Sequence, residues 1–587
     1  MGLLAGAGPN RPKVSRKRAG TLAAHEEPRP LEPGTTVDQT VHNTLLTQLG
    51  RRQIEAFYAS GDWQASTIHR YLEGHASLTP EHVAIRDSHH AFSYSQVLSA
   101  AGRLASHLAS SGLRAGQRVA VWLPSRSEVA VALIACSRLG LVMCPSLHRT
   151  HTAHDVLEFL KTMRAAAFIG EVGHGADSPG AQLFDDVSEL TSMCTVIRLE
   201  PRSEGEGELL GGLGSAELEP PTVDDPESIV YLAFTSGTTG QPKGVLHSDN
   251  TLLANARALS ADWGIDSTSV VYSFSPVSHN LGFGAMVMSL MAGAEFVVHD
   301  APGGASLSER LRSTGATFVV GVPTHAVDLI AELDAGAEPI TTVRGFRLSG
   351  SSGSRDVASS LLRHGILPQS GYGMTEAGSH HYTLPSDDLS RITETSGKAC
   401  RGFEARIFDQ NDPERALPAG EIGQIGCRGA SLMLGYFDNQ TATEDAFNAD
   451  GWFMTGDLGS MDEAGYIRVT GRMKDVIIRG GHNIYPADIE DLAMRFSTVA
   501  MAAAIAIPDD RLGERVCLVV SAKNGGRVDT AELLAFLSAE GLSRFDMPEY
   551  IAEVDAFPLT ASGKILKRAL TTALNEGSLR PEPVASS

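Results

Sequence analysis

The chain has 587 residues and a formal net charge of −21, from 48 Lys and Arg against 69 Asp and Glu. A single hydrophobic core stops growing at roughly 250–300 residues, so more than one domain is expected. The negative charge argues against nonspecific binding to nucleic acid or to anionic lipid, and an anionic substrate would have to be met by local cations.

Cysteine usage and hydropathy favour a cytoplasmic protein. The six cysteines are scattered and form no C-x-x-C pair, so neither a disulfide framework nor a zinc ribbon is indicated. No apolar stretch reaches the ~18–20 residues of a membrane span, and we expect none. The basic segment 1–45 is predicted to be a disordered leader, with organelle targeting as the alternative.

Helical and strand patterns alternate along the first part of the chain, with a helix expected over Ser93–Ser111 and a strand over Arg118–Leu123. This alternation predicts a large α/β body of several subdomains. At Gly471–Asp475 a hinge is expected, followed by a small, mobile α+β domain. The predicted divisions are 1–45 (leader), 46–473 (N-terminal domain), 474–575 (C-terminal domain) and 576–587 (flexible tail).

The loop Thr235–Gly244 follows the apolar run Ile229–Phe234, which is typical of a buried strand. Its glycines let backbone N–H groups approach an anion, its hydroxyls add donors, and Lys243 adds a charge suited to a polyphosphate. The loop is not a Walker motif, because Lys243 is followed by Gly244 rather than Ser or Thr. We interpret it as a phosphate-binding loop, against the alternative of a flexible turn.

Three further motifs follow in order: Gly371–Glu376, Thr455–Asp457 and Pro558–Ile565. Together with the loop they resemble the adenylate-forming superfamily of acyl-CoA synthetases, luciferases and peptide-synthetase adenylation domains, over about Ile68 to Leu574. The resemblance implies ATP, Mg²⁺ and coenzyme A as cofactors. The residues expected to bind them are Thr235, Ser236, Gly237, Thr238, Thr239, Lys243, Tyr372, Gly373, Thr375, Asp457, Arg472, Gly480 and Gly481.

Catalysis in such an enzyme requires cations, since a carboxylate must attack the α-phosphorus of ATP and both are anions. The resemblance assigns this cation to Lys564 and the Mg²⁺ ligand to Glu376, a hard oxygen donor. It also assigns the ribose hydroxyls to Asp457, because a carboxylate can accept from a cis-diol. Lys474 would be the hinge residue. The glycine pair 480–481 would admit the thiol cofactor or form a tight turn.

The acid-binding segment is expected at Ser275–Phe283, where His279 would lie beside the substrate carboxylate as a catalytic residue. The predicted pocket residues are His279, Asn280, Phe283 and Gly350. An isolated His-Asn pair more often belongs to a loop whose polar groups are hydrogen-bonded within the protein than to a substrate-specificity element. Three histidines at spacing three, beginning at His148, are interpreted as a solvated helix start rather than a zinc site.

These features predict an ATP-dependent acid–CoA ligase that forms an acyl-adenylate from a cyclic, aryl or short to medium acid. The partners would be the acid, ATP and CoA, with no nucleic acid. One alternative is an aryl-acid adenylating enzyme that loads an acyl carrier protein. A second is a non-catalytic nucleotide-binding homologue. The identity of the acid and the oligomeric state are left open.

Overall fold

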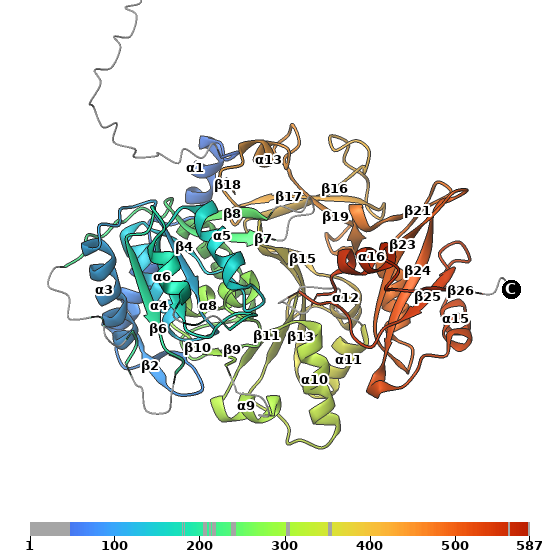
Figure 1. Cartoon of the computed structure of the whole chain (residues 1–587), viewed down its shortest axis with the longest axis horizontal. Coiled ribbons are helices and arrows are strands. Elements are labelled where there is room, and N and C mark those ends of the chain that lie inside the picture. The colour runs from blue at the N-terminus through green and yellow to red at the C-terminus, as the bar shows by residue number, and fades with distance from the viewer. Residues whose placement is uncertain are drawn as a thin grey trace, which may run out of the picture. The chain divides into compact units, whose positions relative to one another are not determined.

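The computed structural model describes residues 47–178, 180, 182–202, 208–210, 213, 219–235, 242–300, 306–349, 355–560 and 564–584 (Figure 1). The predicted leader, residues 1–45, lies outside these ranges. So do five predicted site residues, which are Ser236, Gly237, Thr238, Thr239 and Gly350.

Two largely parallel sheets build the body of the described chain. The first has nine strands in the order β15 (Lys398–Ala399), β14 (Gly378–Tyr382), β13 (Leu367–Met374), β12 (Gly345–Leu348), β11 (Phe318–Gly321), β9 (Val270–Ser273), β10 (Glu295–Val298), β1 (Val83–Arg86) and β2 (Ala91–Ser93). The second has seven, in the order β18 (Gly435–Tyr436), β8 (Lys243–Ser248), β7 (Ile229–Thr235), β4 (Val142–Cys144), β3 (Arg118–Trp122), β5 (Ala165–Glu171) and β6 (Thr195–Leu199).

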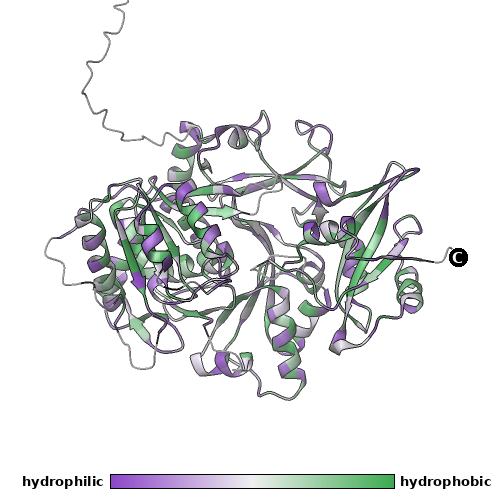
Figure 2. Cartoon of the chain, viewed as in Figure 1, coloured by the Kyte–Doolittle hydropathy of each residue, from purple (hydrophilic) through white to green (hydrophobic). Residues whose placement is uncertain are grey.

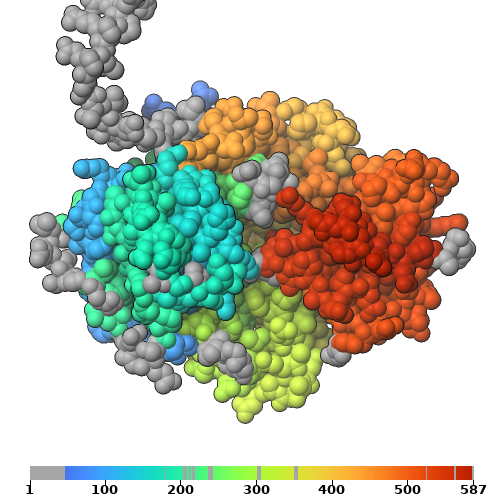
Figure 3. Space-filling model, in the orientation of Figure 1, coloured from blue at the N-terminus to red at the C-terminus, as the bar shows by residue number. Residues whose placement is uncertain are grey.

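Helices cover both faces of each sheet. Between the sheets lie α2 (Ile68–Leu78), α3 (Tyr94–Ser110), α4 (Glu128–Leu139), α7 (Asp249–Trp263) and α8 (Asn280–Ala292). Outside the second sheet lie α5 (Ala153–Met163) and α6 (Gln182–Ser188), and outside the first lie α9 (Leu307–Thr314), α10 (Pro323–Asp334) and α11 (Arg355–Arg363). The yellow-green helix α10 is at the surface in Figure 3. Further helices are α1 (Arg51–Ser60), α12 (Leu389–Glu394) and α13 (Gln440–Glu444).

Side-chain alternation along the strands explains this layering. In β3, Val119 and Val121 join the core between the sheets, whereas Ala120 and Trp122 pack with α5 on the other face. A strand buried on both faces reads as a continuous apolar run, as β3 does. The predicted helix at Ser93–Ser111 and strand at Arg118–Leu123 are confirmed as α3 and β3.

An antiparallel sheet follows, with β16 (Phe403–Phe408), β17 (Gly423–Gly429), β19 (Phe453–Met461) and β20 (Ile467–Arg472). The chain then enters the short 3-10 helix η1 (Met473–Asp475), within which the expected domain boundary falls.

The C-terminal part is an α+β unit. Its elements are β21 (Ile477–Arg479), β22 (His482–Ile484), α14 (Pro486–Met494), β23 (Val499–Asp509), β24 (Gly513–Ala522), η2 (Lys523–Gly525), α15 (Thr530–Ala539), β25 (Tyr550–Glu553), α16 (Lys567–Asn575) and β26 (Glu582–Pro583). Apolar residues concentrate in its long strands (Figure 2), with α14 and α15 packed on one face and α16 on the other. Strand β26 pairs with β25, inside the segment for which the sequence predicts a flexible tail.

Two general findings concern the environment of the chain. In the described ranges, no helix has both the length and the apolar content needed to cross a bilayer. The six cysteines are all thiols in this structure, and five of them are buried.

A buried carboxylate ties α7 to its neighbours. Asp249 follows the N-cap residue of α7 and accepts hydrogen bonds at Oδ1 from the Ile68 backbone N–H (2.7 Å) and the Ser137 hydroxyl (2.9 Å). Burial raises the pKa of Asp249 from 3.8 to about 7. The folded chain therefore holds this proton more tightly than the unfolded chain does. The stabilising effect of the proton is complete below the unfolded value of 3.8 and is lost as the pH rises through about 7.

We expect Asp249→Asn to gain stability relative to the wild type as the pH is raised from about 5 to 8. The amide oxygen keeps the acceptor role without a buried charge, and the gain over this pH range is roughly 3 kcal/mol at most. Thermal unfolding of both proteins across this range measures the effect. Asp249→Ala, which leaves two buried donors without an acceptor, should be destabilised throughout by about 1–3 kcal/mol. A pH-independent difference between Asn and wild type would contradict the assignment.

Candidate active site

Strands β7 and β8 hold the two ends of the predicted phosphate loop together. Thr235 is paired with Lys243 across the hairpin, and its hydroxyl donates to the Lys243 carbonyl at 3.3 Å. Gly244 has a packing role, since a Cβ there would come within 2.8 Å of Leu232 and 3.0 Å of Phe437. The strand before the loop is confirmed, and the ends of the loop are fixed by the sheet.

Lys243, at the end of the loop, is followed by a chain of two contacts that leads through a tyrosine to a glutamate. The Lys243 ammonium lies 4.8 Å from the centre of the Tyr436 ring, and the Tyr436 hydroxyl donates to Glu376 Oε1 at 3.1 Å. Glu376 is buried, which raises the pKa of its carboxyl above the ordinary value. A dication beside this carboxyl would offset that cost.

The donor set fits Mg²⁺. The described residues contain no cluster of three or more His, Cys, Asp or Glu side chains that could hold a metal ion. Mg²⁺ is bound through one or two carboxylates, with phosphate oxygens and waters completing its octahedron. Glu376 alone can supply the protein ligand, and its second carboxylate oxygen, Oε2, is not used by Tyr436.

Asp457 joins three elements at the predicted ribose site. Its Oδ2 accepts from the Tyr372 hydroxyl at 2.8 Å, and its Oδ1 lies 3.1 Å from Arg472 Nε. Asp457 and Arg472 are direct partners across β19 and β20. Only 6% of Asp457 is exposed, and each of its carboxylate oxygens has a partner among these groups.

The segment between β13 and β14 is a tight hairpin anchored to β8. The carbonyl of Thr375 is 2.8 Å from His247 Nε2. At Gly373, a Cβ would come 2.3 Å from the Gly378 carbonyl oxygen, so only glycine allows the two strands to approach this closely. The sequence explains neither contact, because both depend on residues brought together by the sheets.

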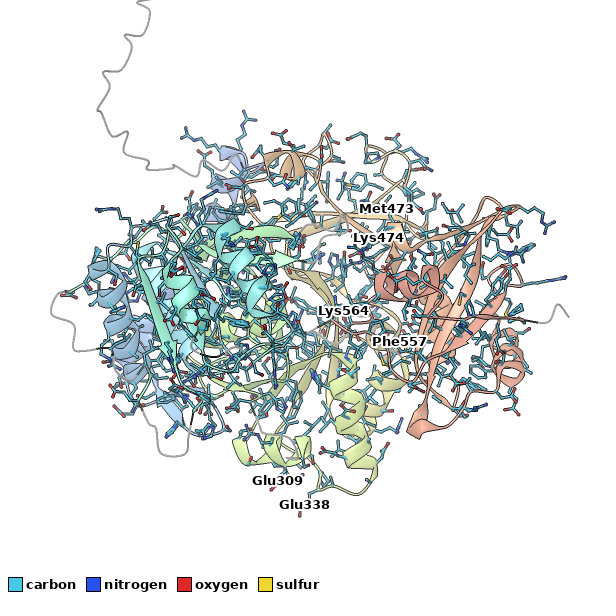
Figure 4. The ribbon with its side chains drawn as sticks, in the orientation of Figure 1. Glu309, Glu338, Met473, Lys474, Phe557 and Lys564 are labelled. Carbon is cyan, nitrogen blue, oxygen red and sulfur yellow. The ribbon has the colours of Figure 1, made fainter. Side chains whose placement is uncertain are left out.

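Lys564 projects from a pinned loop. Leu559 and Ile565 form an antiparallel bridge, and Lys564 N donates to Thr560 Oγ1 at 3.0 Å. The protein around the ammonium group, and then the Arg472 guanidinium, lower the pKa of Lys564 below 10.5, although the residue keeps contact with solvent. The Asp457 carboxylate opposes this effect. The structure thus brings Lys564, which is labelled in Figure 4, within electrostatic range of Arg472 and Asp457.

The predicted hinge and glycine pair lie just before the C-terminal unit. Lys474 is an exposed residue of η1, directly after Arg472 and Met473. Gly480 and Gly481 join β21 to β22 with φ of 60° and 86°, respectively. Two consecutive positive φ values suit a two-residue hairpin turn. The tight-turn interpretation is therefore confirmed.

A narrow cavity lies between α7, α8 and the first sheet. Asn280 lines it, and its amide donates to the Met374 carbonyl at 3.3 Å. Phe283 does not line it, because this residue is one step round α8 and stacks on Tyr231 with ring centres 4.3 Å apart. Phe283 is thus not part of the lining of this cavity, and its role in the acid pocket stays a prediction.

His279 also lies apart from the cavity lining, as the N-cap residue of α8. Its ring stacks on His148 with centres 4.1 Å apart. His154 is exposed in the first turn of α5, as predicted, whereas His148 is only partly exposed, and burial and then the charge of His279 lower its pKa to about 2. The neutral imidazole of His148 accepts or donates to the Ser278 hydroxyl at 3.1 Å. Spacing alone could not have paired two histidines 131 positions apart.

Comparisons with known proteins agree with this geometry. Residues 72–437 match the AMP-binding enzyme family, and 488–564 match its C-terminal domain. The chain is 30% identical to a medium-chain fatty-acid–CoA ligase of Escherichia coli over 87% of this chain and 91% of that protein. It is also 30% identical to a feruloyl-CoA synthase of Amycolatopsis, over 84% and 96%.

Solved structures show the same fold. ATP-bound MatB from Rhodopseudomonas palustris superposes with a TM-score of 0.75 at 28% identity, covering 85% of this chain and 98% of that one. The o-succinylbenzoate CoA synthetase MenE of Bacillus subtilis, in complex with its acyl-adenylate, gives 0.73 at 25% identity, with coverage of 85% and 97%.

The chain belongs to the AMP-binding enzyme family. It is an AMP-forming acid–thiol ligase with a large α/β body and a smaller C-terminal domain, as the sequence predicts. Its cofactors are ATP, Mg²⁺ and CoA.

Asp457→Asn should raise the KM for ATP about 10- to 100-fold, because the predicted charge-assisted hydrogen bonds from the ribose and the ion pair with Arg472 would be lost. Initial rates at varied ATP concentration measure the change. Glu463→Gln, an exposed carboxylate in the turn between the same two strands, is the matched control and should leave the KM unaltered. Equal effects of both substitutions would argue against a ribose role for Asp457.

Proposed function

We propose that the chain joins a cyclic, aryl or short to medium-chain carboxylic acid to CoA in two steps. The acid carboxylate attacks the α-phosphorus of ATP, giving an acyl-adenylate and pyrophosphate. The CoA thiol then attacks the acyl carbon, giving the thioester and AMP. The observation that carries the proposal is the position of Lys564, which is close enough to Asp457 and Arg472 on the body of the protein for both charges to act on its pKa.

Electrostatics explains why these side chains suit the first step. Two anions must meet, and the ammonium of Lys564 offsets their repulsion while Glu376 holds Mg²⁺, which neutralises phosphate charge. Lys243 lies at the start of β8, beside the loop expected to cradle the phosphates. Asp457 and Tyr372 orient the nucleotide from the other side. These cations thus surround the reacting groups, although the chain as a whole carries a negative net charge.

The second step requires Lys564 to leave, because a long thiol cofactor needs the same approach. We propose that Lys474 and its neighbours in η1 are the hinge for this motion. The Gly480–Gly481 turn would then pass close to the pantetheine. No atom of the described residues lies within 4 Å of the place where a Cβ at Gly481 would be.

The cavity supports a small or flat acid. Its water-accessible space is about 30 Å³, which suits about two water molecules. Much of its wall is apolar, including Leu259, Met288, Phe318 and Val320. The names of the relatives, with feruloyl and medium-chain acids, agree with an apolar substrate body. Asn280 is proposed to contact the acid near its reacting end. His279 does not line this cavity, so its proposed contribution comes from its place beside the substrate carboxylate.

Transfer to an acyl carrier protein is the alternative second step. Incubating the acyl-adenylate with CoA or with a phosphopantetheinylated carrier separates the two, and we expect the CoA thioester. The proposed location is the cytoplasm, where reduced thiols such as the six cysteines persist.

Lys564→Met should lower acid-dependent pyrophosphate release about 10²- to 10³-fold, the usual loss for one preorganised electrostatic donor. A panel of carboxylic acids, assayed with and without CoA, gives the measurement. Lys523→Met, which removes an exposed lysine in η2, is the control. Undiminished release by folded Lys564→Met would overturn the proposal, and so would a wild-type protein that activates no acid in the panel.

The pH profile of the first step should show an alkaline limb below pH 10.5, because the pKa of Lys564 is lowered and the charged form is required. Above that pKa the rate should fall about tenfold per pH unit. Lys564→Arg keeps its proton to higher pH and should move the limb upward, whatever its absolute rate. A limb at the same pH in both proteins would assign the titration to another group.

Gly481→Asn should slow thioester formation relative to adenylate formation, by severalfold or more. Asparagine tolerates positive φ, so the turn can form while a side chain enters the proposed thiol path. Single-turnover transfer from preformed adenylate measures the second step. Gly525→Asn, also at positive φ with open space around it, is the matched control. If both variants behaved alike, a passage at this turn would be excluded.

A further inference from the structure

Arg347 presents an uncompensated positive charge to the acid cavity. It belongs to β12, only 3% of it is exposed, and it is one of the residues that line the cavity. Its neighbours in the lining are the apolar side chains of the strand beside it, Phe318 and Val320. A buried arginine in an apolar wall is unusual, since an unpaired buried charge costs several kcal/mol.

One edge of the guanidinium has no protein partner. Nη1 donates to Gln369 Oε1 at 2.5 Å, whereas Nε and Nη2 are buried and make no hydrogen bond. These two nitrogens share the edge that binds a carboxylate with two parallel hydrogen bonds. The arginine is therefore half satisfied, and its unsatisfied half has the geometry of an oxyanion receptor.

Gln369 adds a third donor of the same kind. Because its Oε1 accepts from Arg347, its Nε2 must be the other branch of the amide, and Nε2 is also buried without a partner. Residues 347 and 369 are direct partners on β12 and β13. The unsatisfied groups are thus all donors, and a ligand that completes them must supply acceptors.

No acidic side chain in the described part of the chain forms an ion pair with Arg347. Burial lowers its pKa to about 10, and the neighbours that raise it are Tyr382 and Cys400. The group is still a cation at neutral pH. Tyr382 contributes its ring face, 5.7 Å from the guanidinium carbon. Its Nη2 lies beside Gly371, where a Cβ would come within 3.4 Å of it, so the guanidinium adjoins the start of the Gly371–Glu376 motif.

We propose that the acid activated by this enzyme carries a second carboxylate, which Arg347 binds through its Nε and Nη2 edge with help from Gln369. The inference rests on the proposed function and specifies its substrate class as short dicarboxylic acids. The apolar wall would contact the carbon body between the two carboxylates, and because the water-accessible space is only about 30 Å³, the lining side chains would have to move apart to admit it. The charge of Arg347 would be neutralised only when substrate is bound, so its burial serves discrimination rather than stability.

The test uses matched acids that differ only at the far end. Butanoate and succinate, hexanoate and adipate, and the monomethyl ester of adipate are assayed by pyrophosphate release with wild-type protein. We expect each dicarboxylate to have a higher kcat/KM than the monocarboxylate of equal length, and adipate to exceed its monomethyl ester. Thermal shifts with succinate or adipate alone give a second measurement that does not require turnover.

Substitution assigns the preference to Arg347. In Arg347→Met the ratio of dicarboxylate to monocarboxylate kcat/KM should fall roughly 10- to 100-fold, the range for charged hydrogen bonds. Arg344→Met, which removes an exposed arginine just before β12, is the matched control and should keep the wild-type ratio. Should Arg347→Met fail to fold, Arg347→Lys decides, since lysine keeps the charge but cannot bind side-on and should also lower the ratio.

The failures are distinguishable. A wild type that activates monocarboxylates but not dicarboxylates overturns the inference and leaves the ligase function standing. An unchanged ratio in Arg347→Met or Arg347→Lys, or an ester that matches adipate, overturns it as well. A wild type that activates no acid removes the proposed function, and the thermal shifts then judge Arg347 alone: no shift with either diacid overturns the inference.

Discussion

The carboxylate of Asp457 is the contact on which the site depends. It connects Tyr372 on the nine-stranded sheet with Arg472 on the antiparallel sheet, and it is the negative charge that opposes the lowering of the Lys564 pKa. Three segments more than 80 residues apart therefore meet at one side chain. A buried carboxylate needs hydrogen-bond donors or cations beside it. The carboxylate that would bind the ribose of ATP therefore also connects the two sheets at the site.

Charge placement follows from the same logic. The chain is acidic overall, yet Lys243, Arg472 and Lys564 are close to the carboxylates Glu376 and Asp457. A site with interleaved charges can receive a triphosphate and Mg²⁺ without a large reorganisation, which is the condition for strong electrostatic catalysis. Arg347 differs from these cations. No carboxylate among the described residues forms an ion pair with it, so its charge is buried beside the acid cavity without a counter-charge.

The stability of the fold and the needs of the site are in tension at several positions. Arg347, Gln369 and Glu376 are buried polar groups, and the folded protein would be more stable with an apolar residue of similar size at each of these positions. Large apolar cores on both faces of each sheet compensate for them. The C-terminal unit has its own two cores, which is consistent with a part that could move without losing its packing.

The sequence by itself determined the family, the layered α/β class and the local elements around the motifs, because strand and helix periodicity and the short motifs are local properties. It identified Thr235, Glu376, Asp457 and Lys564 as one constellation only through the family resemblance, and their roles remain proposals. The tertiary structure alone decided which side chains share a cavity. The ring of Phe283 stacks on Tyr231, the ring of His279 stacks on His148, and Arg347 donates a hydrogen bond to Gln369. Such contacts depend on which strand lies beside which and how each helix is rotated, and one chain's pattern of residues does not encode these in any local window.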